Sequence, residues 1–381
     1  IEAGADECFS FENFHEIHCG SEDIYSVKKK IESDVKNFIS TEIEWLPLNS
    51  VKIFKERHDD LINFFELLDE NDDVQNIYSN AKFVKPWGDK IEKDSGGKIK
   101  VEIYPAMQLG GAPPQLVDQV RDGVVDLIWT VAGYTPGRFP RLEVFDLPFM
   151  AASSLATSQA AQEFVETVGA EDLKDYKILA VHVHAPGKIH TKDKLIKSVN
   201  DLNGLKMRGP TRVISKMLEG LGATPVGMPV PKVAPSLSKG VIDGMVVPWE
   251  IMPSFKLHEL TKAHTEVSGD RGLYTTPFLF LMNKAKYESL SDDLKKVIDE
   301  NSGMALAKLA GELWDGFEGP ARKLAVDAGG EFHELSGDAL KEMKDAGNKL
   351  ISQWIKDANS NGLDGDMLVS TARKLISKYE N

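Results

Sequence analysis

Cysteine is scarce in this chain, which has 381 residues and only Cys8 and Cys19, so a disulfide framework is excluded. No C-x-x-C pair and no Cys/His cluster at zinc-ligand spacing occurs. An uncharged apolar run of about 18 residues is also missing, which argues against a membrane span. The formal net charge is -14, so the chain lacks the broad basic surface on which nucleic-acid binders depend.

The start of the chain, residues 1–4 (IEAG), lacks an initiator Met, a basic segment and an apolar segment, so no secretory signal is visible. We therefore expect an internal fragment or a processed product. Signatures of catalysis are missing as well: there is no G-x-S-x-G, no Walker A pattern and no G-x-G-x-x-G. We predict a protein that is not an enzyme and that uses no cofactor and no metal.

The composition changes abruptly near residues 80–85. Residues 1–80 carry 19 acidic and 7 basic side chains, whereas residues 81–381 carry 40 and 38. Residues 1–80 also hold both cysteines but only 2 of 31 glycines and 1 of 18 prolines. We infer that two modules of different origin meet here without a flexible linker.

The first module has the periodicities of a small α+β unit. The expected order is strand, helix, strand, helix and a short extended segment. The strand covers 8–11, and the first helix follows Ser21 with Val27, Ile31, Val35 and Phe38 on one face. The later elements cover 43–45, 61–68 and 74–77. The second module alternates strands and helices, which is typical of α/β folds with ligand sites at strand ends. Its expected strands are 98–103, 124–131, 178–184, 205–208, 224–226 and 241–247, and its expected helices include 154–168, 213–221 and 233–237 and most of 292–328.

The second module resembles the solute-binding proteins of TRAP transporters, the DctP family. The resemblance rests on an ordered set of segments: 97–105 (GKIKVEIYP), 108–111 (QLGG), 121–126 (RDGVVD), 147–149 (LPF), 201–208 (DLNGLKMR), 221–226 (LGATPV) and 240–244 (GVIDG). It implies a two-lobed, type II periplasmic-binding-protein-like fold that closes on an organic carboxylate. We predict lobe I over 81–185 and 272–381, and lobe II over 186–271.

The first module resembles the C-terminal part of YebC/PmpR regulators. The matching segments are 2–7 (EAGADE), 45–47 (WLP) and 67–80 (LLDENDDVQNIYSN). The N-terminal portion of that family is missing, and so is the first strand that a DctP-like lobe carries before the helix with Trp87. We therefore predict that the chain joins pieces of two proteins.

Two basic residues are the first candidates for ligand binding. Arg208 ends a predicted strand just before Gly209 and Pro210, and a guanidinium pairs with both oxygens of a carboxylate. The resemblance implies that Arg208 is the carboxylate clamp; an interlobe or surface ion pair is the alternative. Lys188 stands where many relatives carry Arg, and a solvated loop lysine is the alternative for it.

Further candidates surround the same predicted cleft. Val247 stands near a ligand-contacting Asn of relatives, which predicts a less polar ligand. Trp129 and Trp249 are candidates for stacking on an apolar or aromatic ligand, with core or hinge packing as the alternative. Tyr134 offers a hydroxyl above the cleft or caps a loop. His184, which shares a strand face with His182, contacts ligand or is a satisfied core group. Glu250 hydrogen-bonds the ligand or holds a cation beside it; the alternative is a carboxylate that the helix dipole stabilises at a helix N-terminus.

The resemblance therefore predicts an extracytoplasmic binding protein, located in the periplasm, that captures a small organic acid. Its partners would be the membrane permease subunits of a TRAP transporter, with no nucleic acid bound by 81–381. The alternatives are a YebC-like regulator, whose parent protein would be cytoplasmic, and an α/β enzyme acting on an organic acid.

Overall fold

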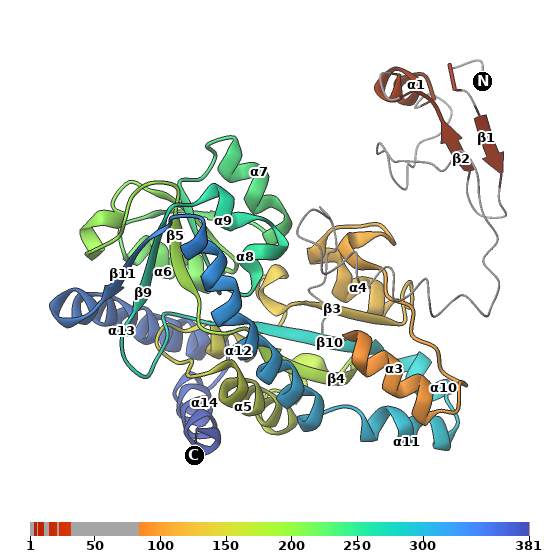
Figure 1. Cartoon of the computed structure of the whole chain (residues 1–381). Helices are drawn as coiled ribbons and strands as arrows, with labels where there is room; N and C mark the ends of the chain where they lie inside the picture. The colour runs from red at the N-terminus through yellow and green to blue at the C-terminus, as the bar shows by residue number, and fades with distance from the viewer. Residues whose placement is uncertain (1–3, 6, 11–14, 21–22, 32–83, 381) are drawn as a thin grey trace. The chain divides into compact units, whose positions relative to one another are not determined.

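The computed structural model describes residues 4–5, 7–10, 15–20, 23–31 and 84–380. The chain divides into two compact units, residues 1–77 with 108–110 and residues 78–107 with 111–381. Each unit is described by itself below (Figure 1).

The first unit contains a β-hairpin and a helix. Strands β1 (Glu7–Ser10) and β2 (His15–His18) pair antiparallel, with Glu7 opposite His18. Helix α1 (Ile24–Ile31) follows and buries Val27. The first predicted strand and the start of the predicted helix are therefore present, whereas β2 was not expected. The elements predicted over 43–45, 61–68 and 74–77 lie outside the described residues.

The second unit has a mixed α/β fold with two sheets. The smaller sheet has the order β3-β10-β4, with β3 (Leu127–Val131), β10 (Pro277–Asn283) and β4 (Tyr176–Val183). The central strand β10 is antiparallel to both neighbours. Strands β3 and β4 thus run in the same direction, as the α/β pattern predicts, but a strand from much later in the chain separates them.

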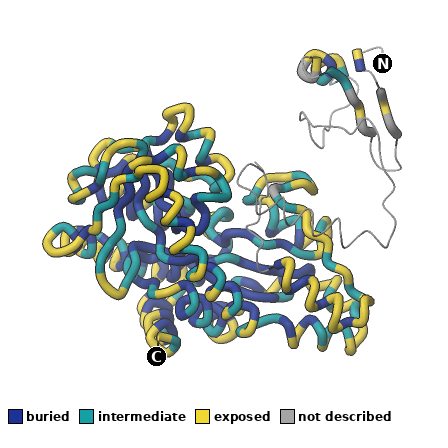
Figure 2. Tube along the Cα trace, in the orientation of Figure 1, coloured by how far each residue is buried: buried dark blue, intermediate teal, exposed yellow. Residues whose placement is uncertain are grey.

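The larger sheet has the order β11-β9-β5-β8-β6-β7. The pairs β9–β11, β6–β7 and β6–β8 are parallel, whereas β5 is antiparallel to β8 and β9. The bounds are β5 (Lys188–Thr191), β6 (Lys206–Gly209), β7 (Thr224–Gly227), β8 (Gly244–Val247), β9 (Ala263–Val267) and β11 (Glu331–Leu335). Figure 2 shows that buried residues follow the strands of both sheets.

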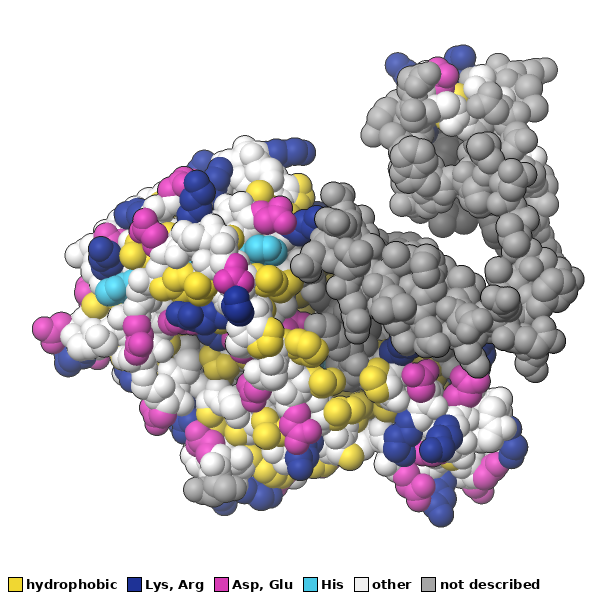
Figure 3. Space-filling view, viewed as in Figure 1, with side chains coloured by type: hydrophobic (Ala, Val, Ile, Leu, Met, Phe, Trp, Pro, Cys, Tyr) yellow, Lys and Arg dark blue, Asp and Glu magenta, His cyan; other side chains and the backbone are white. Residues whose placement is uncertain are grey.

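Helices cover both sheets. They are α3 (Val84–Asp94), α4 (Leu116–Arg121), α5 (Ser154–Thr167), α6 (Arg212–Gly220), α7 (Val233–Ser238), α8 (Ile251–Ser254), α9 (Leu257–Leu260), α10 (Lys284–Ser289), α11 (Asp292–Glu300), α12 (Met304–Asp327), α13 (Gly337–Ser360) and α14 (Gly365–Tyr379). Among the described residues, none of the helices combines the length and apolar character needed to cross a membrane. Figure 3 shows Lys, Arg, Asp and Glu side chains of both signs interspersed over the visible face.

Helix α12 connects the two sheets (Figure 1). Its first half places Leu306 and Ala310 in a core cluster with Phe280 of β10, and its second half places Ala321 and Ala325 in a cluster with β8 residues. Pro320 lies inside the helix between these halves. One helix therefore packs on both sheets, with its proline at the crossing.

Two expectations need comment. The segment 98–103, predicted as a strand, is irregular. Alternating apolar and polar residues form a strand only when they hydrogen-bond to a neighbouring strand, and no described strand pairs with this segment. The predicted lobe boundaries stay a prediction, and β11, within the segment assigned to lobe I, joins the six-stranded sheet.

The approach of α12 to α5 predicts the effect of two matched substitutions in one helix. A Cβ atom on Gly311 would lie 2.6 Å from Cα of Leu155, whereas a Cβ on Gly316 would meet nothing within 4 Å. We expect Gly311→Ala to lower the free energy of unfolding by about 1–3 kcal/mol through overpacking. Gly316→Ala should raise it by up to about 1 kcal/mol through helix propensity. Urea denaturation measures both, and equal effects of the two variants would contradict this packing.

Candidate functional site

Arg208 stands where three parallel strands end. Strand β6 stops at Gly209, Pro210 cannot extend the ladder, and the side chain of Thr211 caps α6 by accepting from the backbone N–H of Ile214. Strands β7 and β8 flank β6 on its two sides. This local sequence places Arg208 at the carboxyl edge of the sheet, in agreement with the predicted strand end.

The guanidinium of Arg208 is buried, with 2% of the residue exposed. Its Nε donates to the carbonyl of Met228 (2.9 Å), after β7, and its Nη1 donates to the carbonyl of Val246 (3.2 Å), in β8. These bonds orient the fork but leave most of its five N–H donors unused by the described residues. No carboxylate of the described residues lies within ion-pair distance. An isolated buried charge is costly, so this geometry favours a bound anion.

Tyr274 packs beside this cation. Its carbonyl accepts from the backbone N–H of Gly187 (2.8 Å), and its ring covers Gly187 so closely that a Cβ there would lie 2.0 Å from a ring carbon. Burial raises the pKa of Tyr274 above its usual range, although the nearby positive charge of Arg208 opposes the shift. Tyr274 is therefore a neutral hydroxyl close to the guanidinium, and no sequence motif pointed to it.

A wall of aromatic rings lies on one face of the three-stranded sheet and α12. Phe278 stacks on His182 (centroids 5.1 Å apart) and on Trp129 (5.0 Å), and Trp314 of α12 contacts Phe278 (5.5 Å). His184 completes the aromatic wall, 6.1 Å from Trp314. Sheet register accounts for two of these contacts: Phe278 is opposite His182 in β4, and Trp129 lies two residues before Val131, the partner of Phe278 in β3. Of the five members, His184 and Trp129 were predicted as site residues.

The two histidines of the aromatic wall are neutral. Burial lowers the pKa of His182 and of His184 to about 3. Nε2 of His182 accepts from the indole N–H of Trp129 (2.8 Å). Nδ1 of His184 lies 2.5 Å from the carbonyl of Ala185, which can only accept, so the proton of His184 sits on Nδ1. Among the described residues, no group of three or more metal-ligating side chains is present.

Lys188 has a carboxylate partner that the sequence did not reveal. Its Nζ forms a short ion pair with Oε2 of Glu318 in α12, and both side chains are mostly buried. The other oxygen of Glu318 accepts from the backbone N–H of Glu250 (2.9 Å). Lys188 is therefore neither a solvated loop lysine nor an uncompensated cation, and Glu250 contributes its backbone to this arrangement.

The remaining predicted residues are divided between the site and the core. The hydroxyl of Tyr134 accepts from the backbone N–H of Val230 (3.0 Å), which links the turn after β3 to the turn after β7. Trp249 lies away from the aromatic wall: its indole donates to Glu266 (2.7 Å), and its ring packs on His190 (4.6 Å). Val247 belongs to the same hydrophobic cluster as Trp249. The structure thus places Trp249 and Val247 in core packing.

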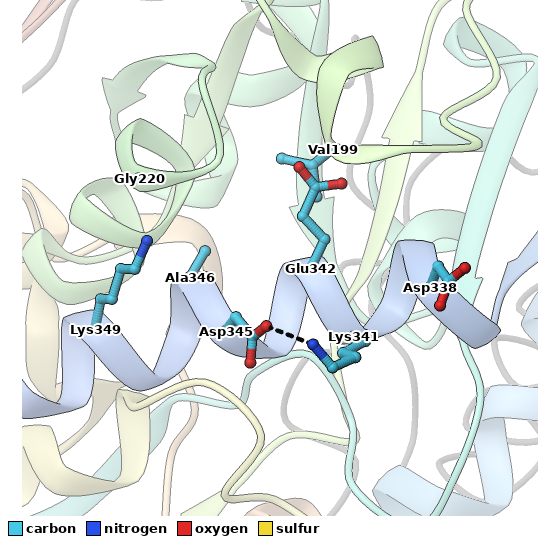
Figure 4. A pocket seen from close by; sticks show the side chains of 8 residues that line it. All are labelled: Val199, Gly220, Asp338, Lys341, Glu342, Asp345, Ala346 and Lys349. Atoms are coloured by element: carbon cyan, nitrogen blue, oxygen red, sulfur yellow. Dashed lines mark hydrogen bonds and ion pairs between the residues drawn. The ribbon is translucent and has the colours of Figure 1, made fainter.

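A hollow of about 480 Å³ lies along α13 (Figure 4). Its charged lining side chains are exposed, and Lys341 pairs there with Asp345 at 3.2 Å. The lining residues are Val199, Gly220, Asp338, Lys341, Glu342, Asp345, Ala346 and Lys349. Because these charges are solvated, the hollow lacks the buried cation that distinguishes the Arg208 site.

Comparison with known proteins gives two matches along the chain. Residues 73–357 match the family model of bacterial extracellular solute-binding proteins, family 7 (DctP), and residues 1–81 match the second and third domain of TACO1/YebC proteins. A relative of this second kind is a probable transcriptional regulatory protein of Pelagibacter ubique, which is 54% identical to this chain over 83 residues. That stretch covers 22% of this chain and 34% of the regulator.

Solved structures resemble the larger unit. A TRAP solute-binding protein from a marine metagenome, described as specific for aromatic acid ligands and solved with meta-hydroxyphenylacetate, is 78% identical. The match covers 80% of this chain and 95% of that one, with a TM-score of 0.79. A TRAP solute-binding protein from Rhodoferax ferrireducens, solved with copurified benzoate, is 48% identical over 79% of this chain and 94% of that one, with a TM-score of 0.77.

The buried histidines predict acid sensitivity with a defined direction. Burial lowers the pKa of His182 and His184 to about 3 and that of His264 to about 4, whereas histidine in the unfolded chain titrates near its ordinary pKa of 6.5. The unfolded chain therefore takes up protons first, and stability present above pH 6.5 is lost as the pH falls toward 4. Each such histidine contributes up to about 1.4 kcal/mol per pH unit in this window.

Urea denaturation at pH 7, 6 and 5 measures this loss. We expect the free energy of unfolding to fall steadily, and His182→Gln to reduce the slope. Burial also raises the pKa of four acids, which opposes the fall; these acids are Asp146, Asp172, Asp315 and Glu318. A free energy that stays constant from pH 7 to pH 5 would show that these histidines are not buried as described.

Proposed function

We propose, from the premise that this chain belongs to the DctP family of bacterial extracellular solute-binding proteins, that it captures an aromatic carboxylate for a TRAP-type transporter. Arg208 would clamp the carboxylate, and permease subunits in the membrane would receive the ligand. The module over 81–381 would act in the periplasm. Solute-binding proteins of TRAP transporters are not enzymes, so binding is the whole of the chemistry.

The observation that carries this proposal is the unmatched guanidinium. Arg208 is 2% exposed, is held by two backbone carbonyls and has no carboxylate partner among the described residues. A ligand carboxylate would supply the missing acceptors in a charge-assisted, bidentate geometry. The alternative reading of Arg208 as an ordinary ion pair lacks the partner that it requires.

Aromatic character in the ligand is supported by a second feature. His184 links the two parts of the site, because it belongs to the aromatic wall and the charge of Arg208 helps to lower its pKa. Offset or edge contacts with such rings favour an aromatic body over a flexible aliphatic one. The two relatives described above, with meta-hydroxyphenylacetate and benzoate, carry ligands of this type.

Two polar contacts support the closure of the protein around a ligand. Each joins a segment next to the six-stranded sheet to a segment next to the three-stranded sheet. Arg212, the first residue of α6, forms two bonds with Glu143 in the 3₁₀ turn η5 (Leu142–Asp146), at 2.6 and 2.8 Å. The bond between Tyr134 and Val230 makes a second link. These contacts would hold the carboxyl end of β6 against the three-stranded sheet while ligand is bound.

The clamp is tested by replacing Arg208 and measuring 3-hydroxybenzoate binding by calorimetry. Arg208→Met should weaken binding by about 2–5 kcal/mol, because the ligand charge would be buried without a partner. Arg208→Lys should bind with intermediate affinity, since it keeps the charge but not the fork. Arg121→Met, which removes an exposed arginine of α4, is the matched control and should bind like wild type.

The same variants separate lost binding from lost folding. Removing an uncompensated buried charge should leave unliganded Arg208→Met at least as stable as wild type in urea. Wild-type affinity in that variant would show that Arg208 is not the clamp. A wild-type protein that binds none of several aromatic carboxylates would contradict the proposed ligand class.

A further inference from the structure

Two cations stand on either side of strand β8, but only one of them is matched. Lys188 is opposite Val247 in the β5–β8 register, and Arg208 donates to the carbonyl of the preceding residue, Val246. Lys188 pairs with Glu318, whereas Arg208 has no carboxylate partner among the described residues. Among the described residues, Arg208 is therefore the cation of this pair that remains available to a ligand carboxylate.

Both Lys188 and the backbone of Glu250 hold the carboxylate of Glu318 in place. It lies in α12 two residues before Pro320, and its second oxygen accepts from the backbone N–H of Glu250 at 2.9 Å. The side chains of Lys188 and Glu318 are 15% and 16% exposed, so the pair is screened little by solvent. The pair is a fixed feature of the site, because it is partly buried and is held by residues of β5, of α12 and of the turn before α8.

Other acids near Lys188 already have donors of their own. Asp315 accepts from the backbone N–H groups of Ser154 (2.8 Å) and Leu155 (2.9 Å) at the start of α5. Glu266 accepts from Trp249 and pairs with Arg322 at 3.2 Å. Among the described acids, Glu318 alone lies within ion-pair distance of Lys188.

We infer that Glu318 sets the charge class of the ligand: by neutralising Lys188 it makes the site accept monocarboxylates and reject dicarboxylates. This inference rests on the proposed function. A second carboxylate entering the site would find Lys188 already paired and would face the negative charge of Glu318. It would then be buried without a cation, which is strongly unfavourable. Glu318 is thus a specificity-determining residue that acts through Lys188.

The test compares ligands of one shape and different charge. Calorimetry with the full chain uses 3-hydroxybenzoate, 3-nitrobenzoate and benzene-1,3-dicarboxylate, because a nitro group is a neutral isostere of a carboxylate. Wild type should bind the first two and reject the dicarboxylate by a factor of at least about 100 relative to 3-nitrobenzoate. Equal rejection of both meta-substituted acids would show that size excludes the dicarboxylate, and the inference would be wrong.

Three variants complete the design. Glu318→Gln keeps an acceptor for the N–H of Glu250 but releases Lys188, so dicarboxylate affinity should rise about 10- to 100-fold. The double variant Lys188→Met/Glu318→Gln should lose that gain, because no second cation remains. Glu163→Gln, which removes a carboxylate that pairs with Lys378, is the matched control and should keep wild-type selectivity.

The outcomes distinguish this inference from the proposed function. If wild type fails to bind 3-hydroxybenzoate, the proposed function itself fails. If wild type binds it but Glu318→Gln gains no dicarboxylate affinity, or keeps the gain in the double variant, the role of Glu318 is refuted. Should Glu318→Gln not fold, the wild-type ratio for 3-nitrobenzoate and the dicarboxylate still decides whether charge is selected.

Discussion

A buried guanidinium, Arg208, that has no carboxylate partner among the described residues is the feature on which the proposed function depends. The carbonyls of Met228, just after β7, and of Val246, in β8, accept from Arg208, which fixes the plane of the fork and does not neutralise it. Pro210 and the Thr211 cap end the strand so that the side chain stays at the sheet edge. The fold thus holds a buried charge that a bound anion would stabilise.

The surroundings of Arg208 are kept close to electrically neutral. Burial holds His182 and His184 in the uncharged form by lowering the pKa of each, and Lys188 is matched by Glu318. Burial also raises the pKa of Asp146, which favours the neutral acid. Because the described groups named above are neutral or paired, they do not cancel the field of Arg208, which would act on a single ligand carboxylate.

Local features of this site were predictable from sequence, and long-range partners were not. The strand and helix around Arg208 follow from the alternation of apolar and basic residues over 205–208, a Gly-Pro stop and a capping threonine, all within about a dozen residues. In contrast, Phe278 meets His182 only through the register of β10 with β4, and Glu318 meets Lys188 across 130 residues. Trp249 also lies near a strand end, but only the folded structure shows that its indole N–H donates to Glu266 in β9.

A crystal structure of the full chain with 3-hydroxybenzoate tests the central claim most directly. The account predicts a carboxylate oxygen within about 3 Å of the guanidinium of Arg208, on the side away from Met228, with the ring against Phe278 or Trp314. A ligand bound elsewhere, or an Arg208 that pairs with a protein carboxylate in that structure, would contradict the account.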